Sequence, residues 1–159
     1  MAALSDNTLQ APGGGAGGPP QDGRPLYQLH LRVRHYELDS LGHVNNAVYL
    51  SYLEQAAIEH AQSMGFGQAR LAELGGLFVV RRHEIDYLGP ASGGDELIIT
   101  TWPAALRGVR AWRAYEIHHA DSAKRLVAAQ TLWVWVDRHS GRPRPVPREI
   151  VTAFAVPSN

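Results

Sequence analysis

The chain has 159 residues, of which 45% are hydrophobic, and its 15 basic and 15 acidic side chains cancel. This predicts one globular domain with a substantial core, and the balanced charge gives no reason to expect a nucleic-acid partner or a polybasic membrane anchor. Because the chain contains no cysteine, disulfides, thiolate metal sites and cysteine nucleophiles are excluded. A chain without cysteine is compatible with a reducing compartment, so we expect a cytoplasmic protein.

The first 25 residues are rich in Gly, Pro, Ala and polar side chains. They contain no apolar run long enough for a signal sequence or a membrane span. Such a composition buries too little apolar surface to offset the loss of chain entropy, so residues 1–25 are predicted to form a disordered tail. The folded domain is expected to occupy residues 26–159.

A strand and a long helix are predicted next. Residues 27–34 alternate between apolar and polar side chains, as in a half-buried strand. From residue 46 to residue 64 the apolar positions recur with the period of a helix that lies on a core, and Asn45 or Asn46 is the expected N-cap. We interpret His60 as a core histidine rather than a catalyst. The predicted buried stripe consists of Tyr49, Leu53, Ala56, Ala57, His60 and Met64.

The rest of the chain has mainly the pattern of strands separated by turns. Short helices are predicted at 67–76 and 147–155, and strands at 77–88, 95–102, 111–119 and 125–137. One strand, one long helix and then four strands predict an α+β domain in which the helix packs against a single curved antiparallel sheet.

The predicted strand at 125–137 is apolar on both faces, whereas a single helix covers one. The other face, or the edge of the sheet, is therefore expected to meet a second copy of the chain in an isologous homodimer. Alternatively, the N-terminal tail or the last helix covers this face. Whether two dimers pair further into a tetramer is left open by the sequence.

A polar elbow that contains Asp39 and His43 leads directly into the long helix. A helix N-terminus carries about half a positive charge and several unpaired backbone N–H groups, which suit an anion or a developing oxyanion. A carboxylate, an imidazole and a helix N-terminus thus lie close together in the sequence. We expect the chemistry of the protein at this elbow.

Two segments carry a resemblance to a known family: YELDSLGHVNNAVYLSYLE at 36–54 and EIDYLGPASGGDEL at 84–97. They resemble hotdog-fold acyl-CoA thioesterases of the 4-hydroxybenzoyl-CoA thioesterase-like superfamily, and with the strand order the likeness covers about residues 26–140. The resemblance implies a hotdog fold, in which a curved antiparallel sheet wraps around one long central helix. It also implies hydrolysis of acyl-CoA thioesters to free acid and CoA.

The resemblance implies a role for several residues. Asp39 matches the catalytic carboxylate, which is either a general base on water or a nucleophile that forms an acyl-enzyme anhydride. Backbone amides from Val44 to Asn46 are the expected oxyanion donors. His43 would hold the acyl carbonyl or orient water, or else be a loop histidine bonded to backbone, and Asn46 stands where some relatives carry a histidine. Glu54 is expected at the edge of the buried helix face, either in the site or as a solvated residue.

A CoA ester needs cations for its phosphates, and Arg suits phosphate through its planar array of donors. Arg107 and Arg110, near the predicted loop before residue 111, are the candidates. CoA is part of the substrate, so no cofactor is expected. No metal site is expected either, because His118 and His119 point to opposite faces of a strand and no other pair of ligands has a recognisable spacing.

Three alternative functions remain open. Thioesterases that act on acyl-carrier proteins share most of the elbow motif, but Leu41 stands where theirs would have Asn. A hotdog hydratase or dehydratase would pair an acid with a histidine, as Asp39 and His43 do in sequence, although the Gly-Asp-x-Asn-Pro-x-His type of motif is missing. A non-catalytic acyl-binding protein is the third alternative, and an intact Asp39 argues against it.

Overall fold

The computed structural model describes residues 18–154, so that parts of the predicted tail and of the last predicted helix, residues 1–17 and 155, lie outside the described residues. All the strands and helices predicted from the sequence occur close to the expected positions. In chain order the elements are β1 (Tyr27–Arg32), a 3-10 helix (His35–Glu37), α1 (Asn46–Ser63), α2 (Gln68–Glu73), β2 (Gly76–Tyr87), β3 (Glu96–Arg107), β4 (Arg110–His119), β5 (Arg125–Asp137) and α3 (Arg148–Ala153).

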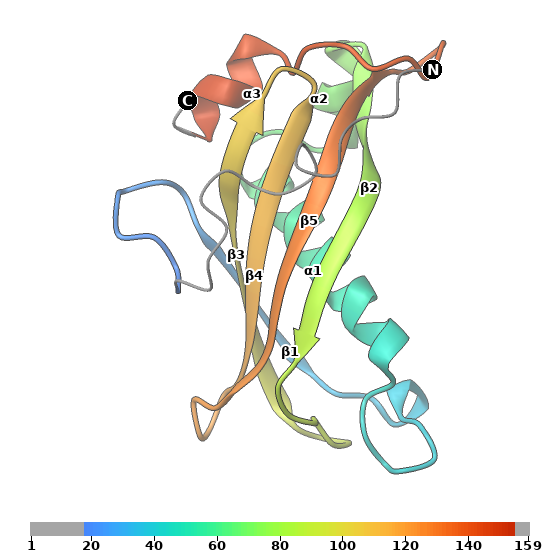
Figure 1. The fold of residues 1–159 in the computed structure, drawn as a ribbon, viewed down its shortest axis with the longest axis vertical. Coiled ribbons are helices and arrows are strands. Elements are labelled where there is room, and N and C mark those ends of the chain that lie inside the picture. Colours follow the sequence, from blue (N-terminus) through green and yellow to red (C-terminus); the bar gives the residue numbers. More distant parts are fainter. Residues whose placement is uncertain (1–17, 155–159) are drawn as a thin grey trace.

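The five strands form one antiparallel sheet in the order β1-β3-β4-β5-β2. β3, β4 and β5 follow one another through short connections, whereas β1 and β2, which flank α1 in sequence, lie at the two edges. Figure 1 shows the long strands curving past α1, which lies across one face of the sheet. This arrangement confirms the predicted α+β class and the hotdog architecture.

The core lies between α1 and the sheet. α1 begins after Asn45, whose side chain accepts from the Ala47 N–H at 2.9 Å, so of the two predicted N-caps the structure selects Asn45. The predicted stripe is confirmed, except that Tyr52 is buried in addition and Met64 is half-buried just past the last helical residue. Against this stripe pack buried residues of the sheet, among them Leu97, Ile99, Tyr115, Ile117 and Val127.

β3 differs most from its predicted length. The sequence predicts an end at Trp102, and the next residue, Pro103, has no N–H to donate to a strand ladder. In the structure the register with β4 shifts between Pro103 and Ala105, and this irregularity lets the strand continue to Arg107. β3 and β4 therefore reach the end of the sheet opposite the elbow, where they form one wall of a cavity described below.

Part of the predicted N-terminal tail contacts the sheet. Residues 18–26 contain neither helix nor strand, but Arg24 Nη1 donates to the carbonyls of Pro103 and Ala104 at 2.9 and 3.0 Å. The domain boundary at residue 26 stays a prediction. Within the described residues, no helix combines the length and the apolar character needed to cross a membrane.

Candidate active site

The elbow between the 3-10 helix and α1 is a closed turn around Asp39. The Asp39 N–H donates to the His43 carbonyl at 2.7 Å, and the Gly42 N–H donates to the Asp39 carbonyl at 3.1 Å. Gly42 has a φ of 76°, in the left-handed region where a side chain is disfavoured. Glycine at this position thus allows the chain to reverse between the carboxylate and the helix.

This turn also orients the Asp39 carboxylate. Its Oδ1 accepts from the N–H groups of Leu41 at 2.8 Å and of His43 at 3.2 Å. Oδ2 has no donor within hydrogen-bond distance among residues 18–154, and the side chain is partly exposed. One carboxylate oxygen is therefore fixed to the backbone, while the other is available to a water molecule or a substrate.

The N-terminus of α1 has fewer unpaired amides than the sequence predicts. The Val44 N–H donates to the Ala91 carbonyl at 2.8 Å, and the Asn45 N–H donates to the Glu37 carbonyl at 2.9 Å. Of the three predicted donors, the Asn46 N–H alone has no acceptor in the described part of the chain. Asn46 is the first residue of α1, where the helix dipole strengthens a donor toward negative charge.

Glu37 anchors the elbow to the rest of the domain. Its buried carboxylate accepts from the Tyr52 hydroxyl at 2.6 Å, from the Arg34 N–H at 2.8 Å and from Arg34 Nη1 at 3.1 Å. Burial by itself raises the pKa of Glu37, but these hydrogen bonds outweigh burial and the pKa is lowered from its usual value. Glu37 thus stays ionised and ties the turn to the buried face of α1.

Replacing Glu37 by Gln is expected to lower the free energy of unfolding by about 2 kcal/mol, because a neutral amide loses the charge-assisted bonds and cannot accept from all three donors. Urea unfolding followed by circular dichroism measures this change. The matched control is Glu73→Gln, which alters an exposed carboxylate on α2 that pairs with Arg70. The control should change stability by less than about 0.5 kcal/mol, and an equal effect of the two variants would contradict the anchoring role.

The second motif segment packs directly against the elbow. His43 pairs with Ser92 in an isolated antiparallel bridge, and the Ala91 N–H donates to the Tyr49 hydroxyl at 3.2 Å. Together with the bond from the Val44 N–H to Ala91, these contacts hold the loop after β2 against the start of α1. The two motif segments, 36–54 and 84–97, therefore pack against each other and form a single local structure.

The structure places His43 in the elbow and Glu54 away from it. The backbone of His43 belongs to the closed turn, whereas neither of its ring nitrogens has a hydrogen-bond partner among the described residues. The imidazole is half-buried. Glu54 is exposed and lies two turns along α1, about 12 Å from the first helical residue at 1.5 Å per residue. Glu54 faces a different feature, a large cavity.

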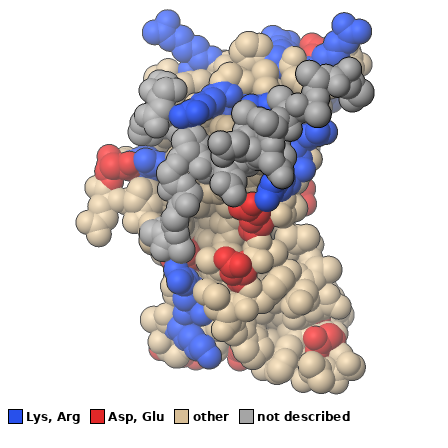
Figure 2. Space-filling view, viewed as in Figure 1, with Lys and Arg blue, Asp and Glu red and all other residues tan. Residues whose placement is uncertain are grey.

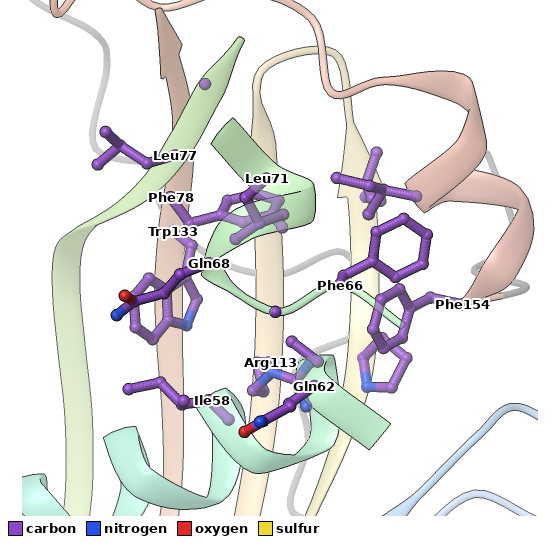
Figure 3. Close-up of a pocket in the computed structure, with 18 of the residues that line it drawn as sticks. Ile58, Gln62, Phe66, Gln68, Leu71, Leu77, Phe78, Arg113, Trp133 and Phe154 are labelled. Carbon is purple, nitrogen blue, oxygen red and sulfur yellow. The ribbon is translucent and has the colours of Figure 1, made fainter. Parts of the chain in front are cut away.

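This cavity of about 1040 Å³ lies at the C-terminal half of α1. Its walls come from α1, α2, the start of β2, the β3–β4 hairpin, β5 and α3, and they are largely apolar. Figure 3 shows Phe78 and Trp133 on one side, Phe66 and Phe154 on the other, and Arg113 between them. Because the elbow is at the N-terminal end of α1, the cavity and the elbow lie at opposite ends of this helix.

Arg107 and Arg110 lie at the cavity end of the molecule. β3 starts beside the elbow, where the Val33 N–H donates to the Asp95 carbonyl at 2.9 Å, and its 12 residues span roughly 36 Å before they end at Arg107. In Figure 2, Lys and Arg side chains gather in the upper half of the view, where the β3–β4 hairpin lies in Figure 1. Of the six predicted site residues, the three in the elbow lie in one local structure, and the other three lie elsewhere in the chain.

His60 is a buried core histidine, as predicted, and it contacts an arginine. Arg113 Nη1 lies 2.9 Å from His60 Nδ1, the Tyr27 ring stacks on the imidazole at 5.8 Å, and Phe154 packs edge-on at 5.3 Å. Burial, and then the charge of Arg113, lower the pKa of His60 to about 4. His60 is therefore neutral at pH 7, and its Nδ1 accepts a hydrogen bond from Arg113.

This lowered pKa predicts a loss of stability in mild acid. Unfolded His60 takes up a proton near pH 6.5, but folded His60 does so only near pH 4, so its contribution is complete above pH 6.5 and is lost as the pH falls toward 4. The expected loss is about 3 kcal/mol in the free energy of unfolding. Urea unfolding at several pH values measures it. His60→Gln keeps an acceptor for Arg113 without titrating and should flatten the curve, whereas parallel curves for the two proteins would contradict this account.

Two residues of the site region, Glu37 and Arg113, are not singled out by the sequence analysis. The capping relation of Glu37 to Arg34, three residues earlier, is a local signal that could have identified it. For Arg113 the signal is strand alternation, because it shares one face of β4 with Tyr115, which is buried against α1.

The curved antiparallel sheet and the long helix that lies across one of its faces have the arrangement of a hotdog fold. A family model described as the thioesterase-like superfamily matches residues 33–154. The chain therefore belongs to the thioesterase-like superfamily.

Individual relatives agree with this assignment. The acyl-CoA thioester hydrolase YbgC of Escherichia coli is 32% identical over 129 residues, which cover 81% of this chain and 96% of YbgC. The chloroplastic acyl-acyl carrier protein thioesterase ATL2 of Arabidopsis thaliana is 29% identical over 129 residues, which cover 81% of this chain and 68% of ATL2. The crystal structure of a probable thioesterase from Bartonella henselae has a TM-score of 0.70 and 30% identity, and the match covers 77% of this chain and 100% of that one.

Proposed function

We propose that the protein hydrolyses acyl-CoA thioesters to free acid and CoA, with Asp39 as the reacting carboxylate. The observation that carries this proposal is the elbow, in which one hydrogen-bonded turn holds a carboxylate with an unbonded Oδ2 close in the chain to the unpaired N–H of Asn46. Thioester hydrolysis needs these two elements: a group that activates or replaces water, and a donor for the oxygen that becomes negative.

In the general-base route, Asp39 accepts a proton from water as the water oxygen bonds to the thioester carbonyl carbon. Negative charge develops on the carbonyl oxygen, where the Asn46 N–H at the positive end of α1 stabilises it by about 3 kcal/mol. The tetrahedral intermediate then collapses, the C–S bond breaks, and the sulfur leaves and takes up a proton. In the nucleophilic route, an Asp39 carboxylate oxygen bonds to the carbonyl carbon, the C–S bond breaks, and the thiolate leaves and takes up a proton. Water then hydrolyses the acyl-enzyme anhydride, which releases the free acid and restores the Asp39 carboxylate.

The other predicted residues have supporting roles in this proposal. The free imidazole of His43 orients water or holds the acyl carbonyl. The side chain of Asn46 supplies a second polar contact at the head of α1, in the place where some relatives of the family carry a histidine. Glu54 contacts bound substrate from the wall of the cavity rather than from the elbow, since its side chain faces that cavity.

The active unit in this proposal is a homodimer. β2 is a 12-residue edge strand, and Val80 and Tyr87 on it are exposed apolar side chains, as is Ile58 on the neighbouring part of α1. Tyr36 and Leu41 of the elbow are 80% and 75% exposed, which is unusual for large apolar residues. Antiparallel pairing of two β2 strands about a two-fold axis removes the open edge and covers these side chains.

Such a two-fold axis would also complete the site. β2 runs from the cavity end to the elbow end, so antiparallel pairing sets the elbow of one subunit beside the cavity of the other. The acyl group then occupies the partner's cavity, and Arg107 of the partner subunit and Arg110 of the partner subunit come near the elbow, where CoA phosphates would bind. Whether two dimers pair further into a tetramer remains a separate question.

CoA is the proposed thiol carrier, and acyl-carrier protein is the alternative. YbgC supports CoA by name, and ATL2 supports acyl-carrier protein.

No cofactor is part of the proposal, because CoA enters as substrate. Among residues 18–154 no three His, Asp or Glu side chains form a group that could hold a metal ion, and a metal-independent reaction stays a prediction. A cytoplasmic location is also a prediction from the sequence, and cell fractionation tests it.

Thiol release from matched thioesters tests the proposed function. The panel contains short, medium, long and aromatic acyl groups, each presented on CoA and on acyl-carrier protein, with and without a chelator. We expect turnover of CoA esters that is insensitive to the chelator. Faster turnover of the same acyl group on carrier protein would favour the alternative donor, and absence of turnover on both carriers would overturn the thioesterase proposal for these substrates.

A further inference from the structure

Arg113 is a charged residue in the wall of a largely apolar cavity. Its Nη1 donates to His60 Nδ1 at 2.9 Å and to Thr101 Oγ1 at 3.2 Å, and its guanidinium carbon lies 5.8 Å from the centre of the Phe154 ring. All three partners are neutral at pH 7. None of the ion pairs formed within residues 18–154 includes Arg113.

A charge in such surroundings is unfavourable unless a counter-charge is present. Two other arginines that contact a buried carboxylate have such a counter-charge: Arg34 pairs with Glu37, and Arg125 pairs with Glu116 at 2.9 Å. Arg113 is instead held in place by neutral acceptors and stacked on an aromatic ring. The protein thus fixes the orientation of this guanidinium without neutralising it, as expected for a residue whose anionic partner arrives with a ligand.

The shape and chemistry of the cavity define that ligand. Ile58, Phe78 and Trp133 supply apolar walls for a hydrocarbon chain, and Figure 3 shows Arg113 projecting into the same space. A guanidinium has five donors in a planar fork that matches a carboxylate, and two Nη1 contacts leave donors for such a group. The strongly hydrated phosphates of CoA do not suit walls of this kind, whereas an acyl chain that ends in a carboxylate suits both the walls and the cation.

We propose that Arg113 binds a carboxylate carried by the acyl group, so that the preferred substrates are monothioesters of dicarboxylic acids. This proposal rests on the proposed thioesterase function. Arg113 acts here as a specificity residue and takes no part in bond making or breaking. His60 is a positioning residue, because it acts through the bond that orients the guanidinium.

Paired substrates test the proposal in the wild-type enzyme. Each pair consists of an acyl-CoA and the ω-carboxyacyl-CoA of equal length, with six, eight, ten and twelve carbons, and the measured quantity is the ratio of their kcat/KM values. We expect at least one pair to favour the dicarboxylic substrate by ten- to a hundredfold, the range of a charge-assisted hydrogen bond. Turnover of the neutral esters with no pair favouring the carboxylate would overturn this inference and leave the thioesterase function standing.

Variants connect the selectivity to Arg113. Arg113→Gln should reduce the ratio of the best pair at least tenfold, and Arg113→Lys, which keeps the charge but loses the fork, should give an intermediate ratio. The matched control is Arg148→Gln, an exposed arginine of α3 outside the cavity, which should keep the wild-type ratio. A ratio in Arg113→Gln equal to that of the wild type would overturn the assignment to this residue.

Binding of a product gives a readout that does not depend on turnover. Calorimetry compares decanedioate with decanoate on the wild-type protein and on Arg113→Gln. We expect decanedioate to bind the wild type at least tenfold more tightly and the variant with no such preference. If no thioester is hydrolysed but this preference is present, the proposed reaction fails and the carboxylate site stands. Equal binding of the two acids by the wild type would overturn the site.

Discussion

Asp39→Asn is expected to lower kcat for thioester hydrolysis by about 100-fold or more, because an amide neither accepts a proton from water nor forms an anhydride. The Asn side-chain oxygen can still accept from the Leu41 and His43 N–H groups that hold the Asp39 carboxylate, so the turn should persist. The loss is expected in kcat rather than in KM, since the carboxylate acts on the reacting carbon. Thiol release at saturating substrate measures it.

Asp121→Asn is the matched control for this variant. Asp121 is an exposed carboxylate in the connection between β4 and β5, and the same chemical change there should leave kcat within about twofold of the wild type. The melting temperatures of both variants should remain close to that of the wild type. A folded Asp39→Asn enzyme with wild-type kcat would contradict the catalytic role of this residue.

Val80→Asp is expected to separate the dimer and to lower activity by at least about tenfold. Val80 is 38% exposed on the edge strand β2, and a carboxylate there would be buried against another subunit without a partner. Size-exclusion chromatography with light scattering should show the wild type near twice the chain mass of 17.4 kDa and the variant near that mass. In the proposed dimer each elbow uses the cavity of the other subunit, so activity should fall with dissociation.

The control for this variant is Leu26→Asp, which also replaces an exposed aliphatic side chain by a carboxylate. Leu26 is 45% exposed and lies just before β1, at the opposite edge of the sheet. It should leave both mass and activity unchanged. A Val80→Asp monomer with the kcat of the wild type would mean that one subunit contains the whole site. A wild-type protein that is monomeric at micromolar concentration would contradict the proposed dimer directly.

The sequence predicted those parts of the fold that depend on local periodicity. The helical stripe from Tyr49 to His60 and the strand at 125–137 follow from patterns of 3.6 and 2 residues, and both are present. The order of strands in the sheet was not predicted from periodicity, because pairing joins segments far apart in the chain. The extension of β3 was missed because Pro103 usually ends a strand, and only the register shift beside it shows why it does not.

The candidate site was predictable to the extent that it lies within one segment. Asp39, His43 and the head of α1 are within eight residues, so the sequence was enough to place them together. The sequence did not indicate that the Val44 N–H donates to the Ala91 carbonyl, more than forty residues away, or that the Asn45 N–H donates back across the turn to the Glu37 carbonyl. The inward position of Arg113 likewise depends on the packing of α1 and α3 around β4.

The most direct test of the central claim is the crystal structure of Asp39→Asn with an acyl-CoA analogue in which an amide replaces the thioester. We predict that the analogue carbonyl oxygen lies about 2.9 Å from the Asn46 backbone nitrogen, with the side chain of residue 39 facing the carbonyl carbon and the acyl chain in the cavity of the partner subunit. A carbonyl oxygen bonded to some other donor, with residue 39 out of reach of the carbonyl carbon, would contradict the account.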